Sequence, residues 1–331
     1  MEKVRFGVIG TNWITEAFIQ AAKETPDFEL TAVYSRTTER AREFADKHGA
    51  AGAYDDIGAM AAGGEIDAVY IASPNFLHAE HAIACMRHGV HVLCEKPLAS
   101  NAAEARAMIE ASERHGVVLM EAIKPVFLPN FAVIRDSLGK IGNVRRYFAS
   151  FCQYSSRYDA FRAGTVLNAF NPALSNGALM DLGIYCLYPA IALFGRPLEA
   201  KANGVMLSSG VDGEGSMLLR YPDMEGVIQY SKISSSSLPS EIQGEDGTIV
   251  IDQISQPSRV EIRYRDGRIL DASVPQSAST MTYEARAFIE AVKAGERRSA
   301  FYSPSDSLAV METMDEARRQ MGLVYPADAK S

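Results

Sequence analysis

The chain has 331 residues, of which 47 % are hydrophobic and 22 % charged, and its formal net charge is −8. This composition is typical of a soluble globular enzyme and argues against long disordered regions. The acidic balance argues against nucleic acid or an anionic membrane as the partner, because both bind basic surfaces. At about 100–200 residues per domain, the length predicts two domains.

The cysteines and the N-terminus bear on the cellular compartment. The four cysteines are scattered and form no C-x-x-C pair, which predicts reduced thiols in a reducing compartment. Met1-Glu2-Lys3 leads directly into an apolar strand-like run, so we expect no secretory signal. No apolar run approaches the roughly 18 residues of a membrane span. We therefore expect a cytoplasmic protein with no membrane partner.

The first 122 residues alternate between short β-branched runs and longer segments of helical periodicity. This alternation predicts βαβ units and a doubly wound parallel sheet, which is an α/β domain over residues 1–122. The predicted strands are 4–9, 30–34, 66–72, 90–94 and 117–120, and the clearest predicted helices are 38–48, 77–89 and 101–115.

The pattern changes near residue 122 and predicts an α+β domain over residues 123–331. A helix at 130–138, a strand at 143–154 and one long helix at 178–194 come first. Residues 197–274 are nearly all strand and turn, with hairpin signals that predict a mostly antiparallel sheet. Two helices, 283–294 and 305–321, complete the predicted order.

The strand at 4–9 ends at Gly10-Thr11-Asn12-Trp13-Ile14, which opens a helix. A glycine-first turn of this kind presents backbone N–H groups and the positive end of a helix to a pyrophosphate. Asn12 and Thr15 replace the second and third glycines of the G-x-G-x-x-G pattern, and Asn tolerates positive φ. An ordinary strand–helix turn is the alternative interpretation.

The tip of the second strand indicates which dinucleotide is selected. A domain that selects NAD usually has an acid here, whereas this chain has Ser35-Arg36-Thr37, with Arg40 one helical turn later. Hydroxyl and guanidinium groups suit a 2′-phosphate, so we expect NADP(H) to be preferred and NAD(H) to be possible. The alternative is a solvated arginine at the start of a helix.

Two further predicted strands end in polar residues. Ser73-Pro74-Asn75 and then His78 follow one strand, and Glu95-Lys96-Pro97 follow another. Ligands of open α/β sheets bind at such carboxyl ends, so these residues are candidate cofactor contacts. Lys96 beside an oxidised nicotinamide could accept or relay an alcohol proton. Turn chemistry and a surface ion pair are the alternatives.

The long helix of the second domain carries Asp181 and Tyr185 on one face, because they are spaced i, i+4. A carboxylate and a phenol together can hold and deprotonate a hydroxyl, and Gly183 between them allows a close approach. A structural pair at a domain boundary is the alternative. The preceding loop offers Asn168, Phe170 and Asn171, which suit a sugar or a cyclic diol, although a simple surface connection explains them as well.

The histidines exclude several mechanisms. All six lie between His48 and His115, so the second domain supplies no catalytic histidine. No cluster of His, Cys and Glu has the spacing of a zinc site, and we expect no metal. Acid–base chemistry therefore falls to Lys, Tyr, Asp or a histidine of the first domain.

These motifs in this order resemble the glucose–fructose oxidoreductase / inositol dehydrogenase family, also written Gfo/Idh/MocA. The resemblance covers residues 3 to 320 and is carried by Gly10 through Ile14, Ser73 through His78, Glu95-Lys96-Pro97, Met120-Glu121-Ala122 and Gly177 through Tyr185. It implies a Rossmann domain followed by a domain with a large open, mainly antiparallel sheet. It also implies a homodimer or homotetramer that associates through that sheet.

The resemblance assigns the family's catalytic lysine to Lys96 and matches Asp181, while Tyr185 stands where many members have histidine. This variation resembles the NADP-preferring branch of dihydrodiol dehydrogenase and glucose–fructose oxidoreductase. An Arg-Phe-His-Pro-like run of many members is here Val126-Phe127-Leu128-Pro129, with Lys124 nearby as a candidate substrate contact. The charge that often lines the pocket is therefore missing or moved.

Together the motifs predict an NAD(P)-dependent oxidoreductase that moves a hydride between a nicotinamide and a sugar, polyol or cyclic diol. Lys96, Asp181 and Tyr185 are the predicted catalytic residues, and either Lys96 or Tyr185 could be the proximal base. Two alternatives stay open. One is a non-catalytic NADP(H) sensor, and the other is a glycosidase that uses its nicotinamide transiently.

Overall fold

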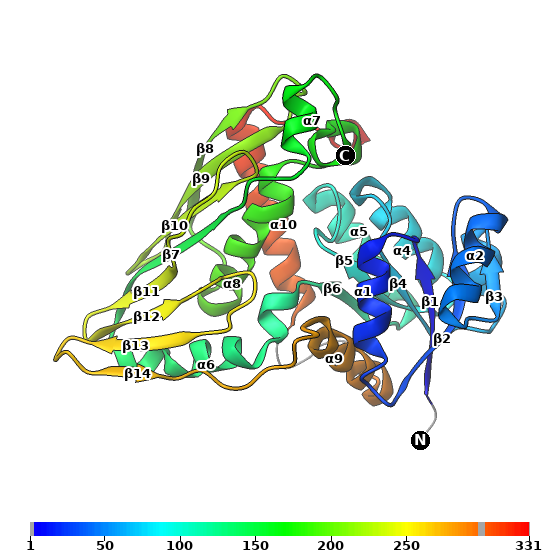
Figure 1. Ribbon diagram of the computed structural model, residues 1–331, viewed down its shortest axis with the longest axis horizontal. Helices are drawn as coiled ribbons and strands as arrows, with labels where there is room; N and C mark the ends of the chain where they lie inside the picture. Colours follow the sequence, from blue (N-terminus) through cyan, green and yellow to red (C-terminus); the bar gives the residue numbers. More distant parts are fainter. Residues whose placement is uncertain (1–2, 297–301, 331) are drawn as a thin grey trace. The chain divides into compact units, whose positions relative to one another are not determined.

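The computed structural model describes residues 3–296 and 302–330, and the chain forms two compact units (Figure 1). The first unit contains Met1–Ala122 and Ser277–Pro304, and the second contains Ile123–Gln276 and Ser305–Ser331. The sequence-based division at residue 122 assigns Ser277–Pro304 to the second domain, whereas the contacts group these residues with the first unit.

The first unit is built on a parallel sheet with the strand order β3-β2-β1-β4-β5-β6. Its strands are buried along most of their length, as expected where helices cover both faces. The strands are β1 (Val4–Ile9), β2 (Phe28–Tyr34), β3 (Gly52–Tyr54), β4 (Ala68–Ile71), β5 (His91–Glu95) and β6 (Leu119–Ala122). The helices are α1 (Trp13–Ala22), α2 (Thr38–His48), α3 (Ile57–Ala62), α4 (His78–Met86), α5 (Ala102–His115) and α9 (Met281–Ala294).

The strand order reverses between β1 and β4, which are neighbours in the sheet although β2 and β3 separate them in sequence. Open α/β sheets bind ligands at the carboxyl ends of their strands at such a reversal. The ends of β1, β2, β4 and β5 are therefore the region where the first unit can hold a cofactor.

Helix α9 belongs to the first unit because it packs on α1. The Phe288 ring meets the Phe6 ring edge-on at a centroid distance of 5.8 Å. The Thr282 hydroxyl donates to the Ala21 carbonyl, and Lys293 pairs with Asp27 at 2.9 Å. The amphipathic pattern at 283–294 predicted the helix but could not indicate which sheet it covers.

The second unit is built on a sheet with the order β14-β13-β12-β11-β7-β10-β9-β8, in which only the β7–β10 pairing is parallel. Its strands are β7 (Val144–Cys152), β8 (Glu199–Met206), β9 (Asp212–Arg220), β10 (Glu225–Ser231), β11 (Ser240–Gly244), β12 (Gly247–Ile251), β13 (Val260–Tyr264) and β14 (Ile269–Asp271). Its helices are α6 (Pro129–Ser137), α7 (Tyr158–Arg162), α8 (Ile184–Phe194) and α10 (Pro304–Met321).

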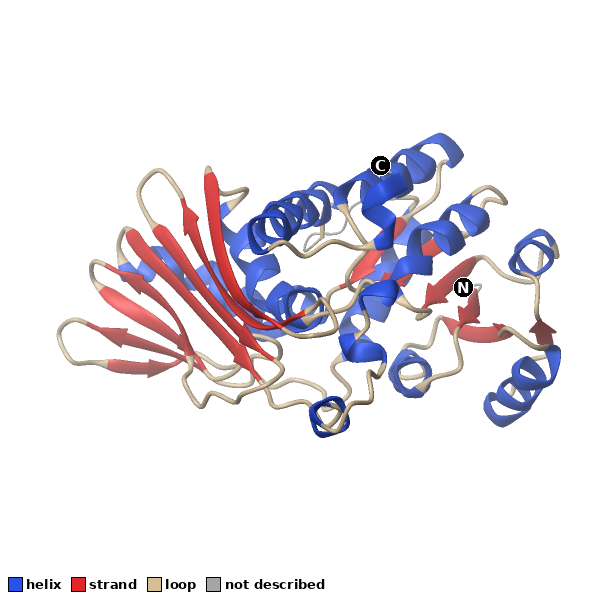
Figure 2. Cartoon of the chain, turned by 90° about the horizontal axis from the view of Figure 1, so that it is seen from above, coloured by secondary structure: helices blue, strands red, loops and turns tan. Residues whose placement is uncertain are grey.

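Helices α6, α8 and α10 lie against one face of this sheet (Figure 1). Figure 2 shows the curved strands of this sheet in red. Met217 and Leu219 of β9 are buried, whereas Leu218 between them is 53 % exposed, so the face of the sheet opposite these helices is open at this strand. The predicted fold class is confirmed: a parallel doubly wound sheet is followed by a large, mainly antiparallel sheet.

One expectation about the long apolar helix was wrong. The stretch Pro172–Phe194 is apolar and long enough to cross a membrane by length and composition, although no apolar run of that length was expected. Burial explains its composition, because 72 % of its most apolar window lies inside the structure. The core helix of a soluble protein has the same character.

Candidate active site

The turn after β1 is shaped by contacts to the end of β4. Gly10 has φ +109°, and a Cβ there would lie 2.8 Å from the Ala72 carbonyl oxygen, so a side chain is excluded on two grounds. Asn12 does not have the positive φ that could have explained its place in the motif; its φ is −102°. Instead its Oδ1 accepts from Ile14 N and caps α1, while its Nδ2 donates to Ala72 O at 2.8 Å.

Arg40 binds the same turn from α2. Its Nε donates to Thr11 Oγ1 and its Nη2 donates to the Thr11 carbonyl, both at 3.2 Å, while Nη1 pairs with Glu43. Thr37 Oγ1 caps α2 by accepting from Arg40 N, and Ser35 N donates to Tyr54 O. Arg36 is exposed beside them. The structure thus gives Arg40 a role in holding the turn.

His78 is buried, and both of its ring nitrogens lie against carbonyl oxygens. Nδ1 is 2.9 Å from Pro97 O and Nε2 is 2.9 Å from Ser73 O. Burial lowers the pKa of His78 to about 4, so the neutral ring donates to one of the two carbonyls at physiological pH. The ring therefore lies between the loop after β4 and the loop after β5, and the cofactor contact of His78 stays a prediction.

Glu95 and Lys96 end β5 at the same edge. The Tyr70 hydroxyl donates to Glu95 Oε1, and the Tyr70 ring stacks on Phe18 at a centroid distance of 3.7 Å. Burial raises the pKa of Tyr70 well above its ordinary value, so the phenol stays a donor. Buried Glu121 accepts from Leu98 N at 2.9 Å and fixes the chain that follows Lys96 and Pro97.

These residues fit a dinucleotide. The backbone of Gly10 can approach a ligand closely, the residues 11–14 at the start of α1 are exposed or half-buried, and Arg36 is an exposed cation at the β2 tip. Ser73, Pro74 and Asn75 lie at the end of β4, next to this turn. Among the described residues, no group of three or more His, Cys, Asp or Glu side chains could hold a metal ion.

The second unit positions its candidate residues through the start of one helical segment. Gly177 has φ +152°, and a Cβ there would lie 2.1 Å from Asp212 Oδ1. This space lets the buried Asp212 carboxylate accept from Ala178 N and Leu179 N, which satisfies the first N–H groups of the segment. Burial raises the pKa of Asp212 to about 6.

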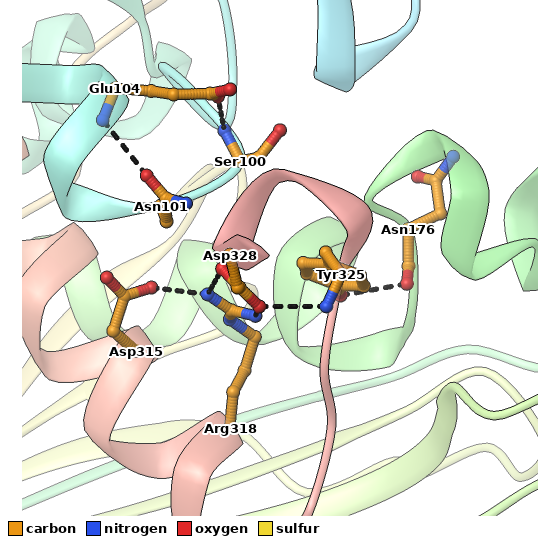
Figure 3. Close-up of polar contacts among 8 residues, drawn as sticks. All are labelled: Ser100, Asn101, Glu104, Asn176, Asp315, Arg318, Tyr325 and Asp328. Atoms are coloured by element: carbon orange, nitrogen blue, oxygen red, sulfur yellow. Dashed lines mark hydrogen bonds and ion pairs between the residues drawn. The ribbon is translucent and has the colours of Figure 1, made fainter. Parts of the chain in front are cut away.

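The end of the chain supports the same start (Figure 3). The Tyr325 hydroxyl donates to the Asn176 carbonyl at 2.9 Å. Arg318 lies over the Tyr325 ring and pairs with Asp315 and Asp328, and Asp328 also accepts from Tyr325 N. Residues 315–328 therefore belong to the scaffold of the candidate site.

The segment itself begins as a π-helix, Leu179–Gly183, before α8. Such π-segments are rare and often occur at functional sites. Asp181 Oδ2 accepts from Lys232 Nζ at 2.6 Å, and the Tyr185 ring meets Phe151 edge-on at 5.6 Å. Lys232 follows β10 and Phe151 lies near the end of β7, so Asp181 and Tyr185 both face the carboxyl edge of this parallel strand pair.

Gly183 allows a close approach, as expected, and the approaching groups are protein side chains. A Cβ there would lie 2.9 Å from Leu179 Cδ1 and 3.0 Å from Tyr230 Cδ1. The glycine thus lets the π-segment lie directly on β10. This contact brings Asp181 to the lysine that follows the strand.

The predicted substrate contacts in the loop have different environments. Phe170 is buried among Tyr158 and Phe161, and the Lys232 ammonium lies 5.5 Å from its ring centre. Asn168 is exposed and its carbonyl accepts from Asn176 Nδ2. Asn171 Oδ1 accepts from Ala173 N and starts a 3₁₀ turn. Lys124 lies in the same unit and donates to Gln256 Oε1 at 3.3 Å.

Tyr70, Asp212 and Lys232 were not among the residues predicted from the sequence. Lys232 follows a strand and precedes a serine run, and its partner Asp181 is 51 residues away, so no local spacing links them. Asp212 looks like an ordinary turn residue before a strand. A lysine at the end of a strand otherwise poor in charge is the one signal that could have drawn attention to Lys232.

Comparisons with known proteins agree with the architecture. Residues 4–123 match the model of an oxidoreductase family with an NAD-binding Rossmann fold, and residues 137–250 match the GFO/IDH/MocA C-terminal domain. The chain is 59 % identical over 325 residues to scyllo-inositol 2-dehydrogenase (NADP(+)) IolU of Bacillus subtilis strain 168, which covers 98 % of this chain and 99 % of that protein.

Two further relatives are more distant. Trans-1,2-dihydrobenzene-1,2-diol dehydrogenase of Xenopus laevis is 31 % identical over 336 residues, with 97 % of this chain and 99 % of that protein covered. The solved structure of KijD10, a 3-ketoreductase from Actinomadura kijaniata in complex with TDP-benzene and NADP, superposes with a TM-score of 0.82 at 26 % identity. That match covers 97 % of this chain and 98 % of the other.

Proposed function

The chain belongs to the GFO/IDH/MocA family of NAD-binding oxidoreductases, and we propose that it is an NADP-dependent dehydrogenase that oxidises a ring hydroxyl of a cyclic polyol. The observation that carries this proposal is the 59 % identity to a scyllo-inositol 2-dehydrogenase along nearly the whole of both chains. Inositols, and scyllo-inositol first among them, are therefore the substrates we propose.

The cofactor would be held by the carboxyl ends of the first unit's strands. Residues Gly10 to Ile14 hold the pyrophosphate, and Ser73, Pro74 and Asn75 flank the rest of the dinucleotide. Arg36, with Ser35 and Thr37, binds the 2′-phosphate, because its guanidinium is exposed at the β2 tip. Arg40 holds the turn through Thr11, and His78 holds the two following loops together. NAD(H) remains usable, since only the 2′-phosphate contact distinguishes the two cofactors.

Proton transfer is assigned to Lys96 and Tyr185. When bound, the nicotinamide supplies the hydride acceptor at C4. Either Tyr185 Oη or Lys96 Nζ takes the single proton of the substrate hydroxyl, and the same group returns it when the ring ketone is reduced. Glu95, held by Tyr70, and Glu121, held by Leu98 N, flank Lys96 and keep its loop in place. Asp181 accepts a hydrogen bond from a substrate hydroxyl.

Asn168, Asn171 and Lys124 complete the polar lining that we assign to the substrate site, and buried Phe170 supports this lining.

We further infer a cytoplasmic protein, which fits four free cysteines of which three are buried. The open face of the second unit's sheet is the surface that we assign to a homodimer or homotetramer. It exposes Val205 by 50 % and Leu218 by 53 %.

The proposal is tested by absorbance at 340 nm. The purified protein is mixed with NADP⁺ or NAD⁺ and with scyllo-inositol, other inositols, aldoses and cyclic diols in turn. We expect reduction with scyllo-inositol and a higher kcat/KM for NADP⁺ than for NAD⁺. Tight NADP binding with no turnover on any compound would favour a sensor, and bond cleavage in a glycoside without net reduction would favour a glycosidase.

A further inference from the structure

Lys232 is a buried cation in the second unit with a carboxylate directly in front of it. Its side chain is 4 % exposed, and its Nζ lies 2.6 Å from Asp181 Oδ2. The Asp181 side chain is 36 % exposed, so one end of the ion pair reaches solvent and the other does not. A buried ammonium is costly unless a charged partner compensates it, so this arrangement strongly favours an ionised Asp181.

The position of Lys232 is fixed from several sides. Its backbone N–H donates to Gly213 O and its carbonyl accepts from Ser155 N, both at 2.8 Å. The ammonium also lies 5.5 Å from the centre of the Phe170 ring, which is within the range of a cation–π interaction. Lys232 is therefore a fixed charge, and Asp181 aligns to it.

The neighbouring carboxylates are engaged elsewhere. Asp212 accepts from Ala178 N and Leu179 N, and Glu214 accepts from the hydroxyls of Ser231 and Ser234. Asp181 is the carboxylate that directly contacts the Lys232 ammonium and is also partly exposed. Neutralising Lys232 would therefore act most directly on Asp181.

We propose that Lys232 is a positioning residue that holds Asp181 ionised and in one orientation, as the acceptor for a hydroxyl of the polyol substrate. This inference rests on the proposed function and deepens it. The buried ammonium lies 2.6 Å from one carboxylate oxygen, Oδ2, and this contact fixes the orientation of the carboxylate group. Lys232 does not touch the substrate, and its whole effect on turnover passes through Asp181.

A double-mutant cycle tests this with scyllo-inositol and NADP⁺, using Lys232→Met, Asp181→Asn and the double variant. A hydrogen bond to a charged group contributes enough that each single variant should lower kcat/KM by about 10- to 100-fold, mainly through KM. The double variant should equal Asp181→Asn, because Lys232 has nothing left to orient. The double variant also lacks the lone buried ammonium that Asp181→Asn leaves, and Lys232→Arg keeps the test valid if Lys232→Met unfolds.

Lys140→Met is the matched control, since Lys140 is an exposed lysine of the same unit. Lys232→Arg should restore part of the lost kcat/KM. Binding of NADPH is followed in every variant by the fluorescence of Trp13, the one tryptophan of the chain, and should not change.

Three results would overturn the inference. In the first, the parent protein is active and Lys232→Met behaves like Lys140→Met. In the second, the two single effects multiply in the double variant, which makes Lys232 independent of Asp181. In the third, the parent neither oxidises nor binds any polyol, by calorimetry with NADP⁺ present; this result removes the proposed function as well, whereas the first two leave it intact.

Discussion

The two units assemble their candidate residues in different ways. In the first unit they come from short contiguous motifs at strand ends, as with Gly10 to Ile14 after β1 and Glu95-Lys96 at the end of β5. In the second unit Asp181 and Tyr185 share one helical segment, but residues far away in the chain hold that segment: Asp181 meets Lys232, and Gly177 admits Asp212. A parallel sheet gathers strand ends at one edge, so local motifs suffice there, whereas a mixed sheet relies on long-range contacts.

The placement of charge differs as well. The first unit leaves Arg36 exposed, where a cation can meet a phosphate. The second unit buries Lys232 and Asp212 and compensates each inside the protein. Substitutions in the first unit should therefore act on the cofactor and on proton transfer by Lys96, and those in the second should act on the substrate, on stability and, at Tyr185, on proton transfer.

The largest effect is expected from Lys96→Met. Loss of a positioned proton-transfer group should lower kcat by about 10³-fold, while NADPH still quenches Trp13 fluorescence with an affinity within a few-fold of the parent. Lys47→Met is the control, because Lys47 is a surface lysine paired with Glu16. Full turnover by Lys96→Met would refute the proposed mechanism.

Asp212→Asn tests the buried charge of the second unit through the pH dependence of the unfolding free energy. Asp212 has a folded pKa of about 6 against an ordinary value of 3.8, so the unfolded chain releases its proton first as pH rises. The parent should lose about 3 kcal/mol of unfolding free energy between pH 4 and 6, relative to the non-titrating variant, and nothing further above pH 6. Urea unfolding at several pH values measures this, and parallel curves for the two proteins would contradict it.

Tyr185→Phe distinguishes the two candidate bases. If the phenol transfers the proton, kcat should fall by about 10²-fold with little change in the KM for scyllo-inositol. Tyr264→Phe, at the end of β13, serves as the control. Near-normal turnover of Tyr185→Phe would leave Lys96 as the proximal group.

The smallest effects are expected from two arginine substitutions in the first unit, which distinguish the roles of Arg36 and Arg40. Arg36→Ala should raise the KM for NADP⁺ by about 10-fold through loss of a charge-assisted contact, and it should leave NAD⁺ unaffected. Arg40→Ala should weaken both cofactors alike, because Arg40 binds Thr11 of the shared turn. Equal effects of Arg36→Ala on NADP⁺ and NAD⁺ would refute the 2′-phosphate assignment.

The sequence predicted most of the first unit because period and turn chemistry are local there. The strand Val4–Ile9 and the helix Thr38–His48 have their predicted bounds. In the second unit, the hairpin signals within residues 197–274 include turns at 221–223 and 265–267, and both join antiparallel strands as expected. It could not predict that α9 packs on α1, because amphipathicity identifies a buried face but not its partner. Nor could it predict the π-segment, which a uniform 3.6-residue pattern conceals.

For the candidate residues too, the sequence identifies the residues themselves but not the distant partners that hold them. Glu95 and Lys96 were identified from their place at a strand end, and Asp181 and Tyr185 from their spacing on one helix. The partners that fix them, Tyr70 and Lys232, lie 25 and 51 residues away in sequence from Glu95 and Asp181. His78 was predicted as a cofactor contact from its motif, and the structure adds that its ring is buried between two backbone carbonyls.

The contact between Tyr325 and Asn176 has a practical consequence for handling the protein. Tyr325 and Asp328 hold the residues near 328 against the residues that precede Gly177. An affinity tag fused directly after residue 331 would therefore disturb the segment that carries Asp181. Lys3, ahead of β1 in the first unit, is exposed. Fusions and surface immobilisation should therefore use the N-terminus, and a biosensor built on this chain should leave its last ten residues unmodified.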